Sequence, residues 1–432
     1  MSQFAAIIII FLIFAFLLQV DFIFYIVYIF LGIYGWSRWM TPRALKSVEI
    51  RREFTDHAFW GEKVPVTVTM RNTSRISVPW LQVRESVAVD LMIRQTANQV
   101  LNLRGRETVS FIYAVQARRR GYYKIGPMQL RTSDLFGLFP DHTAVLPAEY
   151  MTIYPRIMPL NRLGLPSRLP FGTVSSKQRL FEDPARPMGV REYRSGDSLR
   201  QINWKTSAHT RTMMVRTHEP AISLETAVLL NLNLSDYTWH DTQGTVEWAI
   251  ELAASLAAHL VQERQSVGLI TNGIDPLAEG DLAADSHSFD EKSGRLLRQL
   301  IRGKTDNQET GTTPVKIPPR PGRAHLMKIL EQLARIEADT TTPFTAWAAS
   351  ACSQLTWGVT ILAITPQGDE ATCHTLHHLV RAGYNSILLV TEPDAEFSKV
   401  RDRARRLGFS AFHVTQEKDL DQWQRPLPLA HS

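Results

Sequence analysis

Three histidines lie close together near the C-terminal end of the chain, at a spacing that can bind a metal ion. His374 and His378 are four residues apart on a segment predicted to be helical, so their side chains can share one face, and His377 adjoins them. We find no carboxylate at a matching spacing, and we interpret the cluster as a solvated helix face. The sequence contains no Walker A, GxGxxG, HExxH or GxSxG pattern. We therefore predict a protein that is not an enzyme and uses no cofactor.

A second chemically rich stretch, from Arg179 to Glu219, combines arginine with tyrosine and tryptophan. It holds eight basic and five acidic residues, which is too balanced for a phosphate-binding strip. Asp197 precedes a predicted helix over 198–207 and could cap it. Three interpretations stay open: an ion-pair network that fixes a domain junction, a docking face for a partner protein, and an anion site. We favour the structural interpretation, in which Trp204 would be buried.

The elements that must position these residues fall into two patterns, and the first is an alternation of strands and helices from residue 225 onward. Buried strands are predicted at 226–234, 267–271, 358–364, 386–390 and 410–414. Helices are predicted at 249–260, 325–337, 343–355, 372–382 and 395–407. Such alternation indicates a parallel sheet with helices on both faces. Residues 275–322 resemble a polar, proline-rich insertion.

The second pattern is an alternation of apolar and polar residues between 47 and 155, as in Val64–Thr69. Turn signals such as Arg71–Ser74 separate these short runs. The pattern predicts a small β-sandwich, with an irregular linker after it.

The N-terminal stretch is strongly apolar. Residues 4–18 and 22–35 lack charge, and Gln19–Asp21 separate them. One helix over 4–36 would be about 50 Å long against a bilayer core of about 30 Å, so we favour two short spans over one tilted span. A cleaved signal peptide fits less well, because no basic residue precedes the apolar run. Basic residues begin only at Arg38, which predicts a cell membrane protein, in contact with the bilayer through residues 4–36, whose remaining domains face the cytoplasm.

The bulk composition narrows the class of protein. The chain has 432 residues with 48 basic and 42 acidic side chains, a net charge of +6 that a mixed surface accounts for. We therefore expect no nucleic-acid partner, and we identify no small-molecule substrate. The two cysteines, Cys352 and Cys373, cannot build a disulfide framework or a zinc cluster.

The Arg179–Glu219 stretch resembles the signature of the bacterial family called domain of unknown function 58. The matching residues are Arg191, Tyr193, Gly196, Asp197, Arg200, Ile202, Asn203, Trp204, Ser207 and Ala208. His209 follows where the family often has arginine. Upstream, 120–127 and 134–139 also resemble family features, so we expect the resemblance to extend over nearly the whole chain.

The resemblance implies a von Willebrand factor A-like, Rossmann-like α/β domain and partnership with an AAA+ ATPase of the MoxR type. With it the predicted multidomain order is a transmembrane hairpin (1–37), a β-sandwich-like domain (47–157), a signature linker (158–220) and the α/β domain (221–420).

A domain of this type can bind a divalent cation through Asp-x-Ser-x-Ser after its first strand. The corresponding residues here are Asn231, Asn233 and Ser235, so the expected carboxylate is missing. A second acidic ligand is expected after the 358–364 strand, where Asp369 comes late, and Asp236 and Asp241 are out of register. We predict no bound metal and a non-catalytic, membrane-anchored adaptor or scaffold. The alternative is a metal-dependent adhesion or binding module.

Overall fold

The structure, a computed structural model, describes residues 9–10, 13, 21–91, 98–133, 141–160, 182–193, 202–220, 225–238, 240–277, 295 and 314–419. The chain forms two compact units. The first comprises residues 1–156, 275–310 and 330–337, and the second comprises 157–274, 311–329 and 338–432.

The first described helix, α2, runs without a break from Asp21 to Lys46. Its apolar part, from Phe22 to Gly35, is shorter than the ~20 residues that cross a bilayer, and Arg38 follows soon after. No helix in the described part of the chain is long and apolar enough to span a membrane. This finding corrects the predicted transmembrane helices and the predicted membrane localisation; most of the first predicted span, 4–18, lies outside the described residues.

The first unit is built from β-strands that follow the period-two pattern of the sequence. One sheet has the order β1-β3-β6, and the other has the order β2-β9-β7-β4-β5, with β8 also paired to β7. The strands are β1 (Val48–Glu53), β2 (His57–Ala58), β3 (Lys63–Asn72), β4 (Val78–Val87), β5 (Asn98–Leu103), β6 (Thr108–Gln116), β7 (Gly121–Thr132), β8 (His142–Leu146) and β9 (Glu149–Ile153). Along β3, Val64, Val66, Val68 and Met70 are buried, and they pack in one core with residues of both sheets.

A charged pair lies inside this core. Arg52 donates to Glu85 over 2.7 Å, and both side chains are fully buried. Arg52 also donates to the carbonyl of Ile125. Burial raises the pKa of Glu85, and Arg52 opposes that rise. The pair therefore depends on both partners, because a lone buried charge is strongly destabilising.

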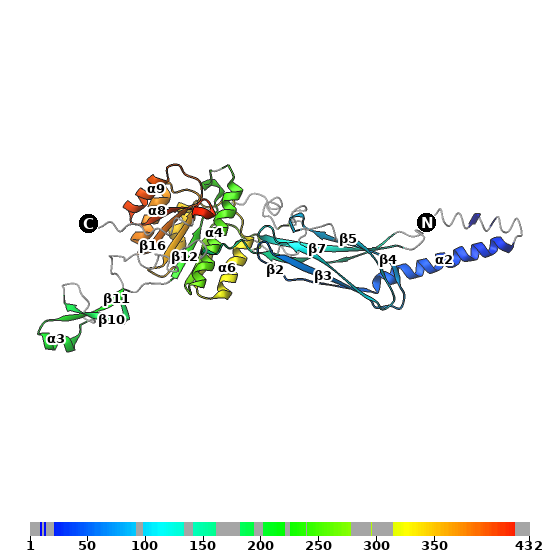
Figure 1. The fold of residues 1–432 in the computed structure, drawn as a ribbon, viewed down its shortest axis with the longest axis horizontal. Helices are drawn as coiled ribbons and strands as arrows, with labels where there is room; N and C mark the ends of the chain where they lie inside the picture. The colour runs from blue at the N-terminus through cyan, green and yellow to red at the C-terminus, as the bar shows by residue number, and fades with distance from the viewer. Residues whose placement is uncertain are drawn as a thin grey trace. The chain divides into compact units, whose positions relative to one another are not determined.

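The second unit contains a six-stranded sheet of order β14-β13-β12-β15-β16-β17, parallel except for β14. Figure 1 shows α4 on one side of this sheet and α8 and α9 on the other. The strands are β12 (Glu225–Leu230), β13 (Ser266–Thr271), β14 (Val315–Arg320), β15 (Thr360–Thr365), β16 (Asn385–Val390) and β17 (Ser410–His413). The helices are α4 (Thr242–Gln262), α7 (Phe344–Cys352), α8 (Glu370–Arg381) and α9 (Phe397–Leu407). The helix α6 (Arg323–Arg335) is divided between the two units after residue 329.

Most of these elements coincide with the segments that hydrophobic periodicity predicted, but β14 does not. The proline-rich stretch of the expected insertion forms this antiparallel strand, which pairs with β13. A separate two-stranded sheet, β10 (Glu182–Glu192) with β11 (Met214–Pro220), carries the short helix α3 (Trp204–Thr210) (Figure 1). The segment expected to be an irregular linker is thus partly a β-hairpin.

Candidate functional site

Polar side chains gather where the parallel strands of the second unit end. Asn231 and Asn233 directly follow β12, Asn272 follows β13, and all three are buried. The carboxyl ends of parallel strands are where open α/β sheets bind ligands, so this edge is the first place to look for function. We call Asn231, Asn233, Asp236 and Asn272 the strand-end cluster.

Main-chain donors fix the orientation of the two central amides. Asn231 Oδ1 accepts from the N–H of Asn233 at 3.2 Å, and Asn233 Oδ1 accepts from the N–H of Thr341 at 2.9 Å. An N–H group can only donate, so each side-chain oxygen must face its backbone donor. The two NH2 groups consequently point the other way, towards Asp236.

The Asp236 carboxylate receives both of these amides. Asn231 donates to it over 2.8 Å and Asn233 over 2.9 Å. A 3-10 turn over Leu234–Asp236 returns the carboxylate to the strand end, although its sequence position is out of register for a ligand. Asp241, the other nearby acid, instead caps α4 by accepting from the N–H of Gly244.

Asn272 completes the cluster. Its oxygen accepts from the N–H of Leu232 at 2.7 Å, and its NH2 group donates to Asn231 Oδ1 and to the carbonyl of Thr342. The side-chain oxygens of Asn231, Asn233 and Asn272 all accept hydrogen bonds from protein donors. The Asp236 carboxylate is surrounded by two amide NH2 groups, which are hydrogen-bond donors. A divalent cation at this position would instead need further oxygen ligands.

Ser235, the third residue of the expected metal motif, has an exposed side chain. The described residues include no group of three or more His, Cys, Asp or Glu side chains placed to hold a metal ion. The strand-end cluster is therefore held together by hydrogen bonds among its own side chains and nearby backbone.

A buried carboxylate that sequence reasoning missed lies at the end of β16. Glu392 accepts from the N–H and the hydroxyl of Thr238, at 2.9 and 3.0 Å, and from Gln367 at 3.0 Å. Asp369, the late candidate for a second acidic ligand, instead caps α8 by accepting from Thr372. Only the tertiary fold brings Glu392 to Thr238, so no local sequence pattern could reveal it.

Tyr237 lies between these acidic groups. Its hydroxyl donates to the carbonyl of Asn231 at 2.8 Å. Burial raises the pKa of Tyr237 far above its ordinary value, and the nearby Glu392 and Asp236 carboxylates raise it further. Tyr237 therefore acts as a hydrogen-bond donor and not as a proton acceptor near neutral pH.

The histidines of α8 do not converge on a site. His377 is bonded to the carbonyl of Leu407, and His374 lies 3.6 Å from Glu370. Glu370 is a carboxylate at the matching spacing that the sequence prediction overlooked. The free thiols offer no nucleophile either, since burial raises the pKa of Cys352 to about 12 and also raises that of Cys373.

The described part of the family-like signature surrounds α3. The helix begins at Trp204 and its cap is Asn203, which accepts from the N–H of Thr206. Of the predicted helix over 198–207, residues 204–207 are helical and 198–201 lie outside the described residues. Ser207 accepts from the N–H of Met214 at 2.8 Å and donates to the carbonyl of Asn203, which ties α3 to β11. Gly196, Asp197 and Arg200 lie outside the described residues.

The remaining signature residues divide by exposure. Ile202 is buried and pairs with the buried Val215, and Arg191 and Tyr193 are partly buried. Ala208 is exposed, and Trp204 is 68% exposed, so the expectation of a buried tryptophan is wrong. Trp204 starts a seven-residue helix beside a two-stranded sheet, a unit too small to cover a large ring.

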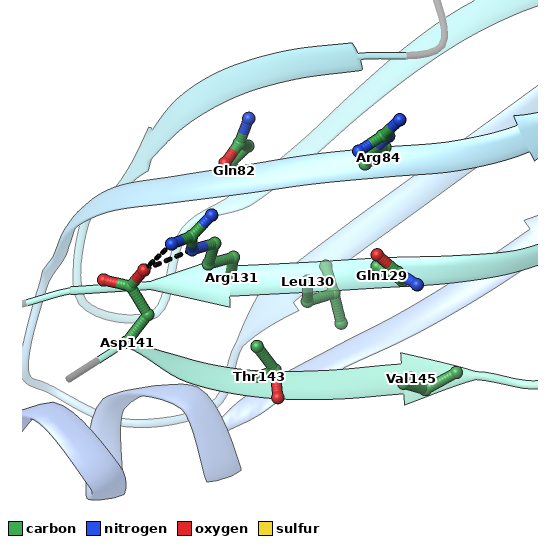
Figure 2. A pocket seen from close by; sticks show the side chains of 8 residues that line it. All are labelled: Gln82, Arg84, Gln129, Leu130, Arg131, Asp141, Thr143 and Val145. Atoms are coloured by element: carbon green, nitrogen blue, oxygen red, sulfur yellow. Dashed lines mark hydrogen bonds and ion pairs between the residues drawn. The ribbon is translucent and has the colours of Figure 1, made fainter.

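A shallow pocket of about 480 Å³ lies on the first unit, over β4, β7 and β8 (Figure 2). Arg131 pairs with Asp141 there, and Arg84 lies between Asn98 and Gln129 in the strand register. The eight side chains drawn are polar or small aliphatic groups, with one carboxylate, which is already paired. They offer hydrogen bonds but no arranged acid–base or nucleophilic pair.

Comparison with known proteins finds a family model that is similar to the part of the chain that carries this signature. Residues 189–312 match the family model described as "Protein of unknown function DUF58". The "Uncharacterized protein YeaD" of Bacillus subtilis (strain 168) is 22% identical over 229 residues, which cover 51% of this chain and 56% of that protein. The chain thus spans about half the length of this curated relative.

Solved structures resemble about a quarter of the chain. The CARDB domain of the PF1109 protein from Pyrococcus furiosus, solved with di-metal ions, is 14% identical, covers 24% of this chain and 91% of its own, and has a TM-score of 0.18. The cupredoxin domain of amoB from Nitrosocaldus yellowstonii is 12% identical, covers 25% and 87%, and has a TM-score of 0.19. TM-scores this low do not establish a shared fold.

Proposed function

We propose that this chain is a non-catalytic adaptor whose second unit is a von Willebrand factor A-like module with its cation position closed by amides. The strand-end cluster is the observation that supports this proposal. Chemistry at this edge would need a group free to exchange a proton or bind a cation. Here Asn231 and Asn233 donate to Asp236, and their oxygens are used by other donors.

The partner we propose is an AAA+ ATPase of the MoxR type, as the resemblance to the signature family implies. An adaptor needs no catalytic turnover of its own. Strand ends that are fixed by hydrogen bonds suit a rigid scaffold. The direct test is to immobilise the full chain and measure binding of a purified MoxR-type ATPase, together with its rate of ATP hydrolysis. Saturable binding supports the adaptor; absence of binding at micromolar concentrations contradicts it.

A metal titration separates the adaptor from a metal-dependent binding module. We expect no shift in melting temperature on adding Mg²⁺ or Mn²⁺. A bound cation at about 100 times its dissociation constant would stabilise the chain by about 2.7 kcal/mol. A shift of that size that Ser235→Ala abolishes would favour the metal-dependent module.

A further inference from the structure

Large apolar side chains are exposed on the β10–β11 hairpin and its helix. Val190 is 41% exposed, Trp204 68% and Met213 53%. The hydrogen bond from the N–H of Asn203 to the carbonyl of Met214 holds the start of α3 beside Met213. Trp204 and Met213 are therefore near neighbours at one end of the hairpin.

The local fold does not depend on these exposed groups. Ile202 and Val215 supply the buried contact, Asn203 caps the helix, and Ser207 ties it to β11. Trp204 adjoins all of them in sequence yet faces outward. Tryptophan is among the residues that most often dominate binding energy at protein interfaces, where its large ring fills a pocket of the partner.

The charge around Trp204 indicates the chemistry of the partner. Residues 189–193 and 202–216 contain four basic side chains, Arg191, Lys205, Arg211 and Arg216, and one acidic side chain, Glu192. Lys205, Arg211 and Arg216 are exposed. A positive surface selects a negative one, because like charges brought together at an interface cost free energy.

We propose that this surface, made of Trp204, Lys205, Arg211 and Met213 and called here the Trp204 surface, docks an acidic protein segment that carries an apolar pocket. The inference names the docking surface of the adaptor proposed above, and so rests on that proposal. A second copy of the chain is disfavoured as the occupant, since two basic surfaces would face each other.

Photo-crosslinking in cells tests the surface without assuming the partner. In the full chain, Trp204 is replaced by p-benzoylphenylalanine, and the crosslinked peptide is sequenced. We expect an adduct with a protein segment rich in Asp and Glu. The matched control places the same group at Trp60, which is 47% exposed on the first unit and should not give this adduct.

Charge reversal tests the electrostatic part. Lys205→Glu combined with Arg211→Glu should remove the Trp204 adduct and weaken binding of the purified MoxR-type ATPase at least tenfold. The matched control, Arg401→Glu with Arg405→Glu, reverses two exposed cations of α9 and should change neither. If the hairpin variant does not fold, Trp204→Ala, with an expected loss of about thirtyfold, provides the same comparison.

The outcomes distinguish the two proposals. An adduct with an acidic segment of another protein supports the Trp204 surface and contradicts the ATPase partnership. ATPase binding that all hairpin variants retain supports the adaptor and overturns the Trp204 surface. An adduct with nucleic acid, an adduct with a second copy, or no adduct at all also overturns it.

Discussion

Replacing one amide of the strand-end cluster by a carboxylate should make the stability of its hydrogen-bond network depend on pH. In the Asn231→Asp variant, the NH2 donor that lies 2.8 Å from Asp236 becomes a carboxylate oxygen. The other Asn231 oxygen can still accept from Asn233 and Asn272. Only the contact with Asp236 changes from attraction to repulsion, in a place where residue 231 is 1% exposed.

The size of the effect follows from that geometry. Two unit charges about 4 Å apart repel by about 4 kcal/mol at an effective dielectric constant of about 20. The folded variant limits this cost by taking up a proton, because each carboxylate of the pair raises the pKa of the other above the ordinary Asp value of about 3.9. We therefore expect a loss of about 3–4 kcal/mol in the free energy of unfolding at pH 7.

The sign of the pH dependence is fixed by this raised pKa. Below about pH 4 both the folded and the unfolded variant are protonated at this position, and the protonated acid can donate to Asp236 as Asn231 did. As the pH rises through the folded-state pKa, the folded state must release its proton, and stability is lost. The difference between variant and wild type should thus be small at pH 4 and largest at pH 7 and above.

Hydrogen exchange of the β12 amides in increasing urea would measure this loss in the second unit alone. Mg²⁺ at about 100 times its dissociation constant should restore about 2.7 kcal/mol of the lost free energy of unfolding. The reason is that the variant has two neighbouring carboxylates, which can bind the cation, where the wild type has an amide and a carboxylate. The control is Asn98→Asp, an exposed position of β5, which should change stability by less than about 0.5 kcal/mol. An Asn231→Asp variant as stable as wild type at pH 7 without metal would refute the reasoning.

Three further predictions concern stability. Arg52→Met should destabilise the first unit by about 3–5 kcal/mol in urea because it leaves Glu85 buried without its cation, and adding Glu85→Leu should recover most of this loss. Burial lowers the pKa of His259, whose ring nitrogens have no hydrogen-bond partner among the described residues; unfolding should therefore become easier as pH falls below about 6.5, and His259→Leu should flatten that dependence. Trp204→Ala should change the free energy of unfolding by less than about 0.5 kcal/mol, whereas Ile202→Ala should lower it by about 2–5 kcal/mol. A larger loss for Trp204→Ala than for Ile202→Ala would mean that Trp204 is buried.

The sequence predicted the sheet elements of the second unit well because their burial is uniform. The apolar segment 267–271 lies within β13 (Ser266–Thr271), and the segment 386–390 lies within β16 (Asn385–Val390). A strand covered on both faces has no polar position to interrupt its apolar run. The boundaries of these two strands are therefore visible in the sequence to within a residue, whereas the predicted strand over 226–234 extends four residues past the end of β12 (Glu225–Leu230).

The strand-end cluster was only half visible for a different reason. The family resemblance placed Asn231 and Asn233 at the end of the first strand, although periodicity alone extended that strand to residue 234. Asp236 joins them through a 3-10 turn, and Glu392 reaches Thr238 across 154 positions of sequence. Neither contact leaves a periodic signal.

The hairpin was missed because proline and glycine interrupt the sequence pattern of its strands, and the predicted helix over 198–207 overlaps α3 only in part. The pairing of β10 with β11 spans a stretch that includes Pro184, Pro187 and Gly189, and its register shifts there. Proline and glycine usually indicate loops, so periodicity predicted none of this pairing.

The antiparallel strand β14 affects how the second unit behaves among other molecules. Among the described strands, β14 lies at the end of the strand order and pairs with β13 alone. Its sequence VKIPPR places Pro318 and Pro319 side by side. Neither proline has an N–H group to offer to a further strand, and Lys316 and Arg320 add positive charge along the same strand. An incoming β-strand would find neither a complete row of donors nor a neutral surface. We therefore expect β14 to oppose edge-to-edge pairing at its own edge of the sheet; Gly268 permits this arrangement, since a side chain there would collide with Ile317 and Pro319.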